Sequence, residues 1–213
     1  MRTTVWTAAL CGLLLAVTPA SSAVPTSCHL VTDVAGDGGD REQGMAVGPN
    51  LPDLDIVSAD IASTREQITT VVRLSDLGTA LQAAPRSESY EFFFRIHGHD
   101  VATIAKRSVD GEAFSVEYTD PERGDVPGTS TTVDATGAFD VAKNEVRVTV
   151  PVKEVNGGRY TLRSDRFDHL ALNTYAGLGT RQLHGSGAYR SFDYAGTAKT
   201  YRPVAPSCVV VGR

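Results

Sequence analysis

The sequence predicts an all-β protein, built as an antiparallel β-sandwich of the immunoglobulin or jelly-roll kind. Apolar and polar residues alternate with a period of two in several segments, and turn-forming dipeptides separate these segments. No amphipathic helical stretch exceeds about three turns. Strands that recur about every 8–12 residues are typical of sandwiches and barrels. We therefore expect two packed sheets and no large helical layer.

Individual strands follow from this alternation. It is clearest at residues 68–75, 90–97, 114–119 and 145–150, where every second side chain is apolar except Thr70. Weaker alternation predicts further strands at residues 54–61, 101–106, 160–163, 169–175 and 209–211. Turns are expected at residues 97–100, 110–111 and 156–158, each of which contains glycine. Short helical turns are expected at residues 75–82 and 152–155.

Residues 33–52 differ from the rest of the chain. They are rich in glycine and aspartate and have little apolar pattern, which predicts a long acidic, glycine-rich loop near the N-terminus. Residues 122–130 and 177–187 are predicted to be two further glycine-rich loops.

The N-terminus has the composition of a secretory signal. Arg2 is the only charge before an apolar run from Ala8 to Val17, Pro19 ends that run, and small residues lead to a cut after Ala23. The run is too short to span a bilayer, and no later stretch is long and apolar enough to do so. We therefore expect residues 1–23 to be a signal peptide and residues 24–213 to form a single secreted domain without a membrane anchor.

Removal of the signal would leave two cysteines, one near each end of the chain. Cys28 and Cys208 permit one intramolecular pairing, and an extracellular compartment favours it. Chain-entropy arguments give a disulfide around such a long loop on the order of 5 kcal/mol as an upper estimate. Neither cysteine lies in a Cys-x-x-Cys motif, so we expect a structural disulfide rather than reactive thiols.

Charge excludes one class of partner. The chain has 20 Lys and Arg against 25 Asp and Glu, a formal net charge of −5. Nucleic-acid binding requires clustered positive charge, so we expect no nucleic-acid partner.

Several motifs lie between residues 28 and 163. They are Asp33-x-x-Gly36-Asp37, Leu54-Asp55-Ile56 with Ser58 and Asp60, residues 71–77, Tyr90-Glu91-Phe92-Phe93-Phe94 and Val148-Thr149-Val150-Pro151. Together they resemble uncharacterised secreted proteins of high-GC Gram-positive bacteria. More distantly, they are similar to β-sandwich modules of the DOMON and family-9 carbohydrate-binding type. The resemblance implies a non-catalytic binding module, often with a structural calcium ion. This chain lacks the tryptophan platform of the carbohydrate-binding modules and an assignable His/Met haem pair.

The acidic loop is the first candidate site. Calcium takes six to eight oxygen ligands on flexible loops. The chain offers carboxylates there and at the next strand, so the residues considered as calcium ligands are Asp33, Asp37, Asp40, Asp55 and Asp60. The spacing is not that of an EF-hand. The alternative, which the sequence favours slightly, is a solvated acidic loop whose aspartates form turns.

Two other groups of residues have side chains that occur in zinc sites or in serine hydrolases. His97 and His99 flank a glycine, and zinc would need at least one more ligand than they provide, so we expect solvated turn residues. Ser186 lies in His-Gly-Ser-Gly, close to a nucleophile elbow, and Asp168 with His169 would complete a triad. A small serine hydrolase is therefore an alternative function.

Tyrosines gather late in the chain. Tyr175, Tyr189 and Tyr194 could stack on a ligand if exposed, although closure of the core and its rim is the favoured interpretation. The leading prediction is a secreted, non-catalytic binding or structural module. No cofactor is certain, and calcium is the one candidate considered. Its partner would be an extracellular glycan or protein, and an inhibitor or other partner-binding protein is the third alternative.

Overall fold

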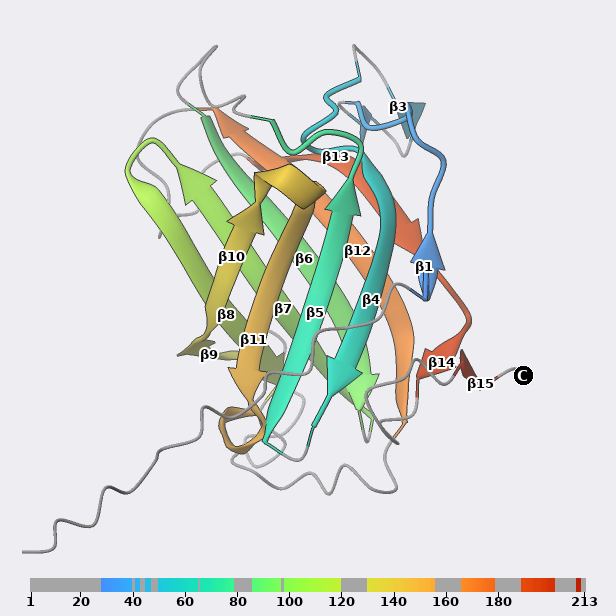
Figure 1. Ribbon diagram of the computed structural model, residues 1–213, viewed down its shortest axis with the longest axis vertical. Coiled ribbons are helices and arrows are strands. Elements are labelled where there is room, and N and C mark those ends of the chain that lie inside the picture. Colours follow the sequence, from blue (N-terminus) through green and yellow to red (C-terminus); the bar gives the residue numbers. More distant parts are fainter. Residues whose placement is uncertain are drawn as a thin grey trace, which may run out of the picture.

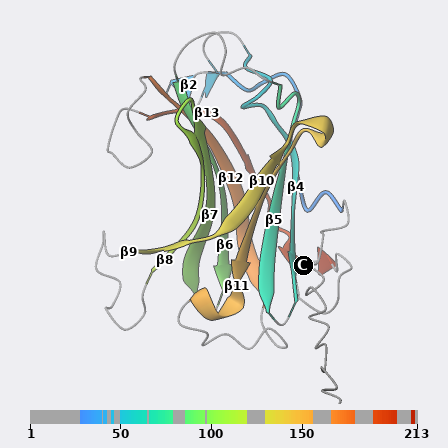
Figure 2. The ribbon, with the colours of Figure 1, turned by 60° about the vertical axis from the view of Figure 1, so that its left-hand side comes forward.

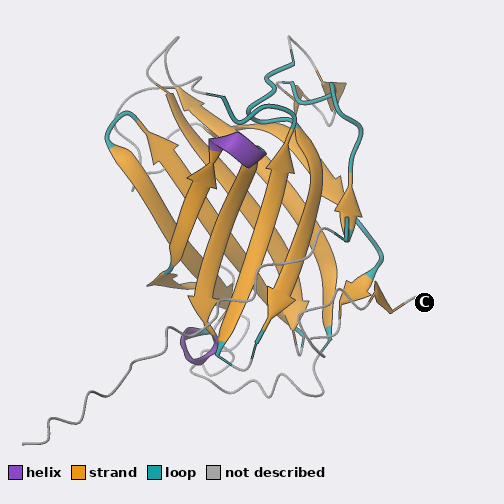
Figure 3. Ribbon diagram, in the orientation of Figure 1, coloured by secondary structure: helices purple, strands orange, loops and turns teal. Residues whose placement is uncertain are grey.

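The fold is an antiparallel β-sandwich, as the alternation predicts (Figure 1). The structure is a computed structural model that describes residues 28–39, 41–42, 45–46, 50–64, 66–78, 86–96, 98–119, 130–155, 166–178, 189–201 and 210–211. Figure 2 shows the two sheets as separate layers, with β6, β7 and β12 in one and β4, β5 and β11 in the other. Figure 3 shows that strands dominate the described residues.

The smaller layer has five strands in the order β1-β4-β5-β11-β10. These are β1 (Val31–Thr32), β4 (Ile56–Ser63), β5 (Gln67–Leu74), β11 (Glu145–Pro151) and β10 (Thr136–Asp140). The larger layer has the order β15-β14-β12-β6-β7-β8-β9, and β13 also pairs with β12. Its strands are β6 (Arg86–Ile96), β7 (His99–Ser108), β8 (Gly111–Thr119), β9 (Ser130–Asp134), β12 (Phe167–Leu178), β13 (Tyr189–Gly196), β14 (Thr200–Tyr201) and β15 (Val210–Val211). A separate short pair joins β2 (Arg41–Glu42) to β3 (Met45–Ala46).

The core lies between the two layers and uses one side of each strand. Ile68, Val72 and Leu74 of β5 are buried there, whereas Arg73 points to the opposite side. The facing layer contributes Phe92 and Phe94 of β6, together with Leu172 of β12. Burial of these apolar side chains supplies the main driving force for folding.

A buried ion pair adds polar contacts to this core. Arg107 Nε of β7 lies 2.5 Å from Glu88 Oε2 of β6, and the hydroxyl of Tyr90 donates to the same oxygen over 2.8 Å. Tyr90 also donates to the carbonyl oxygen of Asp53 over 2.9 Å, and Arg107 Nη2 lies 3.8 Å from Asp53 Oδ2. These contacts fix the residues before β4 over one end of the larger sheet.

Most predicted strands and two turns are confirmed. Gly98, with φ +80°, connects β6 to β7, and Gly111, with φ +135°, begins β8 after the β7–β8 turn. The helical turn expected at 152–155 is the 3-10 turn η4 (Val152–Glu154). The strand expected at 160–163 and the turn at 156–158 lie outside the described residues.

The helical turn expected at residues 75–82 is wrong in its described part, residues 75–78, which are not helical. Their backbone N–H groups bond to distant partners instead. Ser75 donates to the carbonyl oxygen of Asp55 over 2.9 Å, and Leu77 donates to Asn144 Oδ1 over 2.9 Å. These contacts hold the backbone of residues 75–77 against Asp55 and Asn144 in a non-helical conformation. Asn144 follows a second 3-10 turn, η3 (Val141–Lys143), that was not predicted.

Candidate functional site

Two aspartates of the acidic loop meet a third from the other end of the chain. Asp33 and Asp37 follow β1, and Asp193 lies on β13. One carboxylate oxygen from each lies within 4.8 Å of the others, which is a spacing that a single cation could bridge. Asp193 was not among the predicted ligands. It is fully buried, whereas Asp33 is half-buried.

Hydrogen bonds from both sheets hold Asp193 in place. Its Oδ2 accepts from the backbone N–H of Ile56, on β4, over 2.7 Å. Its Oδ1 accepts from the N–H of Tyr194 over 2.7 Å. The β12–β13 register shifts at this point, because Asp193 pairs with Thr174 whereas Ser191 pairs with Tyr175. The bulge directs the Asp193 carboxylate towards β4.

Burial raises the pKa of Asp193 to about 6. The two backbone hydrogen bonds act in the opposite direction, and the nearby carboxylates of Asp33 and Asp37 raise the pKa further. A bound cation would stabilise the ionised form of all three groups. The described cluster therefore has the donor chemistry of a calcium site, although it contains only two of the predicted ligands.

Asp55, one of the predicted calcium ligands, accepts hydrogen bonds from the acidic loop and from Ser75. Its Oδ2 accepts from the N–H of Gly36 over 2.8 Å and from the hydroxyl of Ser75, and its Oδ1 accepts from the N–H of Gly38 over 3.2 Å. The side chain is fully buried. These contacts make Asp55 a tether that folds residues 36–38 onto the start of β4. Asp40 lies outside the described residues.

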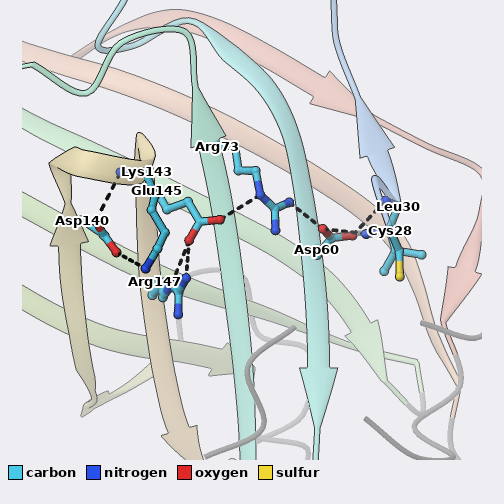
Figure 4. A network of polar contacts seen from close by, with 8 residues as sticks. All are labelled: Cys28, Leu30, Asp60, Arg73, Asp140, Lys143, Glu145 and Arg147. Atoms are coloured by element: carbon cyan, nitrogen blue, oxygen red, sulfur yellow. Dashed lines mark hydrogen bonds and ion pairs between the residues drawn. The ribbon is translucent and has the colours of Figure 1, made fainter. Parts of the chain in front are cut away.

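Asp60 is also a tether, shown in Figure 4. Its carboxylate accepts from the backbone N–H groups of Cys28 and Leu30, each over 3.1 Å, and from Arg73 Nη1 over 2.5 Å. Arg73 in turn donates to Glu145 Oε1 over 3.0 Å, and Arg147 pairs with the other oxygen of Glu145. This row of charges crosses β4, β5 and β11 and fixes the segment that leads into β1.

A pocket of about 860 Å³ lies beside an irregular part of β12, where the chain passes from β13 to β14. The pairing of β12 with β6 is irregular between Asp168 and Ala171, and His169 has a left-handed backbone with φ +52°. Opposite this bulge, β13 ends at Gly196 and β14 begins at Thr200. The bulge in β12 and the break between β13 and β14 lie next to each other, and together they leave an opening in the surface of the sheet. A non-glycine residue in the left-handed region is strained, and such strain is concentrated at functional sites.

Charged groups line one end of this pocket. His169 Nδ1 lies 2.8 Å from Asp168 Oδ1, and Arg166 Nη2 lies 3.6 Å from Asp168 Oδ2. The carboxylate of Asp168 therefore orients the imidazole ring of His169. This end of the pocket presents a guanidinium, an imidazole and a carboxylate to anything bound inside it.

An aromatic ring forms another wall. Tyr194 is 51% exposed and lines the pocket. The pocket residues Ala171 and Gly196, both of them small, pair across β12 and β13. A Cβ atom at Gly196 would lie 2.9 Å from Tyr194 Oη, which shows that the ring extends over this glycine. Any larger residue at position 196 would displace the ring.

The remaining predicted residues lie in different places. Tyr175 is half-buried on β12 and does not line the pocket, and the side chain of Tyr189 lies outside the described residues. His97, Ser186 and Cys208 also lie outside them. Asp168 and His169, which the sequence suggests only as partners of Ser186, both line the pocket. Asp193 and the pocket have no local sequence signal, because each depends on a strand bulge.

Comparison with known proteins identified no matching family model, no similar curated protein and no similar solved structure. Among the described residues, no helix is long and apolar enough to cross a membrane.

The raised pKa of Asp193 predicts a specific pH dependence of stability. Its folded pKa of about 6 exceeds the ordinary 3.8, so the folded state binds the proton more tightly. This contribution is fully present below about pH 4 and is lost as the pH rises through about 6. Between these pH limits, and without calcium, the unfolding free energy of the wild type should therefore fall by on the order of 2–3 kcal/mol through this group. Asp193→Asn should lack this part of the fall.

Urea unfolding at a series of pH values, in the presence of a chelator, measures this difference. Asp134→Asn is the control, because Asp134 is exposed on β9 and far along the larger sheet. Parallel pH profiles for the wild type and Asp193→Asn would contradict the assignment.

Proposed function

We propose that this chain is a secreted, non-catalytic β-sandwich module that binds an extracellular glycan in the pocket beside Tyr194. The pocket is the observation that carries this proposal, because it combines an exposed aromatic ring with charged hydrogen-bonding groups. In the proposed protein residues 1–23 are the cleaved signal peptide, and residues 24–213 are the mature domain. The resemblance to DOMON and family-9 carbohydrate-binding modules stays a prediction.

The chemistry of the walls favours a sugar. A sugar ring presents an apolar face that packs on an aromatic side chain, here Tyr194. Its hydroxyl groups both donate and accept hydrogen bonds. Asp168 supplies acceptor oxygens and Arg166 supplies N–H donors at the charged end. A ligand that fills this space therefore has one apolar face and several polar edges.

The shape of the site favours a small ligand over a protein surface. Small-molecule pockets measure roughly 300–1,000 Å³, and this pocket lies within that range. A stable protein partner would bury about 800 Å² on each side across a wider, flatter surface. We therefore place the glycan, rather than a protein partner, in this pocket.

We also propose that calcium binds Asp33, Asp37 and Asp193 and supports this module. The three carboxylates come from two segments that are far apart in sequence, so a bound ion would cross-link the residues after β1 to β13. Backbone carbonyl groups or water would complete the coordination that calcium requires.

The Cys28–Cys208 disulfide belongs to the same proposal. Lys199 Nζ donates to the carbonyl oxygen of His29 over 3.3 Å, which brings the residue before β14 next to Cys28. Thr200 of β14 pairs with Val211 of β15, three residues beyond Cys208. These described contacts support a pairing of the two ends of the domain.

A serine hydrolase is the second candidate function. The hydrogen bond between His169 and Asp168 favours it, because a catalytic base requires an orienting carboxylate. Ser186 would be the nucleophile. Labelling of the wild type by a fluorophosphonate probe, lost in both Ser186→Ala and His169→Ala, would favour this function over a non-catalytic module.

The glycan proposal predicts that Tyr194→Ala weakens binding about tenfold or more, because the stacking surface is lost. Gly196→Val should weaken binding similarly by displacing the Tyr194 ring. A printed glycan array identifies the bound sugars, and titration calorimetry with the sugar that binds best measures the affinities. Val109→Ala, which removes an apolar side chain that is 55% exposed and lies outside the pocket, is the control. The proposal fails if the wild type binds no glycan on the array, or if Tyr194→Ala and Gly196→Val bind as tightly as the wild type.

The calcium proposal predicts a higher melting temperature in calcium than in chelator. At a hundredfold excess over Kd the stabilisation is about 2.7 kcal/mol, which corresponds to roughly 5–10 °C for a domain of this size. Asp193→Asn should abolish most of this rise, whereas the exposed Asp134→Asn should retain it. Differential scanning calorimetry makes the comparison. An identical transition of the wild type in calcium and in chelator would exclude the site.

A further inference from the structure

The outward face of the larger sheet continues from the pocket as a row of four side chains. Tyr194 of β13 pairs with Asn173 of β12, which pairs with Glu91 of β6, which pairs with Ile104 of β7. Their sequence neighbours in the core are Ala195, Leu172, Phe92 and Ala105, so these four side chains point away from it. The side chain of Ile104 is nevertheless buried. Tyr175 lies two residues after Asn173 on β12, and so on the same face of the sheet. We call Asn173, Tyr175 and Glu91 the outer band.

The outer band is a connected polar and aromatic surface. Tyr175 lies close enough to Asn173 and Glu91 for both to shift the pKa of its hydroxyl group, which Glu91 raises and Asn173 lowers. The hydroxyl of Ser89 donates to Glu91 Oε1 over 3.3 Å, and the positive charge of Lys106 lowers the pKa of Glu91. Burial raises the pKa values of both Glu91 and Tyr175, so these polar groups are partly desolvated although they lie on an outward face. The outer band shares with the pocket an aromatic ring and a carboxylate, and it adds an amide.

Strand spacing fits the repeat of a sugar chain. Neighbouring strands lie ~4.8 Å apart, which is close to the length of one pyranose unit. The steps from β13 to β12 and from β12 to β6 therefore place a new set of contacts under each successive unit. A chain that leaves the pocket at Tyr194 and crosses the strands would meet Asn173 with Tyr175 first, and Glu91 next.

We propose that the pocket is the terminal subsite of a longer site, and that the outer band binds the continuation of an extended oligosaccharide across β12 and β6. This inference rests on the proposed glycan-binding function. In this arrangement Tyr194 binds the terminal unit, whatever the length of the chain. Tyr175 packs against a following unit. The amide of Asn173 donates hydrogen bonds to its hydroxyl groups or accepts them, and the carboxylate of Glu91 accepts hydrogen bonds from them.

The test uses a glycan array that carries neutral oligosaccharides of one composition in increasing length, followed by calorimetry with a short and a long member. Wild-type affinity should rise with length. Tyr175→Ala and Glu91→Gln should each weaken binding of the long member about tenfold and leave binding of the short member unchanged. Tyr194→Ala should weaken both. Glu112→Gln, at an exposed position of β8 outside the outer band, should match the wild type.

The outcomes separate the inference from the function on which it rests. The longer site would be overturned if the wild type bound short and long members equally tightly, or if Glu91→Gln lost the same affinity for both. Either result would leave the proposed glycan binding in the pocket unaffected. Failure of the wild type to bind any glycan would overturn the proposed function itself. Because Glu91→Gln conserves the shape of the side chain, it provides the result even where Tyr175→Ala does not fold.

Discussion

The buried carboxylate of Asp193 is the constraint on which both candidate sites depend. It accepts one backbone N–H from β4 in the smaller sheet and one from Tyr194 in the larger sheet, so it joins the two layers. A buried carboxylate is unfavourable unless such donors satisfy it. On one side of β13 the group faces Asp33 and Asp37, and on the other the next residue lines the pocket. The position of one side chain therefore sets the geometry of the acidic cluster and of the aromatic wall.

Two other buried aspartates also accept hydrogen bonds from backbone N–H groups of a different segment. Asp55 binds the backbone N–H groups of residues 36 and 38, and Asp60 binds those of Cys28 and Leu30. Both tether the segment around β1 to β4. Carboxylates suit this task because hydrogen bonds to an ionised acceptor are stronger than those between neutral groups. An acidic composition in this part of the chain thus arises partly from architecture, and only some of its carboxylates are available to an ion.

The sequence was sufficient for the parts of the fold that alternation specifies. Residues 68–75 and 90–97 alternate because one side of each strand packs in the core, and the structure places Ile68, Val72, Phe92 and Phe94 there. Strand β13 was not predicted because one of its buried positions is Asp193, which breaks the apolar pattern. Asp33 and Asp37 were recognised as candidate ligands, but their partner lies more than 150 residues later and meets them only through tertiary structure. The pocket likewise depends on the bulge at His169, and no glycine or proline at this position indicates the bulge in the sequence.

Amide hydrogen exchange tests the role of Asp193 most directly. The N–H groups of Ile56 and Tyr194 lie on different sheets and share this single acceptor, so the account predicts that Asp193→Ala makes both exchange much faster. Amides in the middle of the β6–β7 ladder should keep their protection in the same sample, since that pairing does not involve Asp193. Unchanged protection at Ile56 and Tyr194 in a folded Asp193→Ala protein would contradict the claim that this carboxylate joins the two sheets.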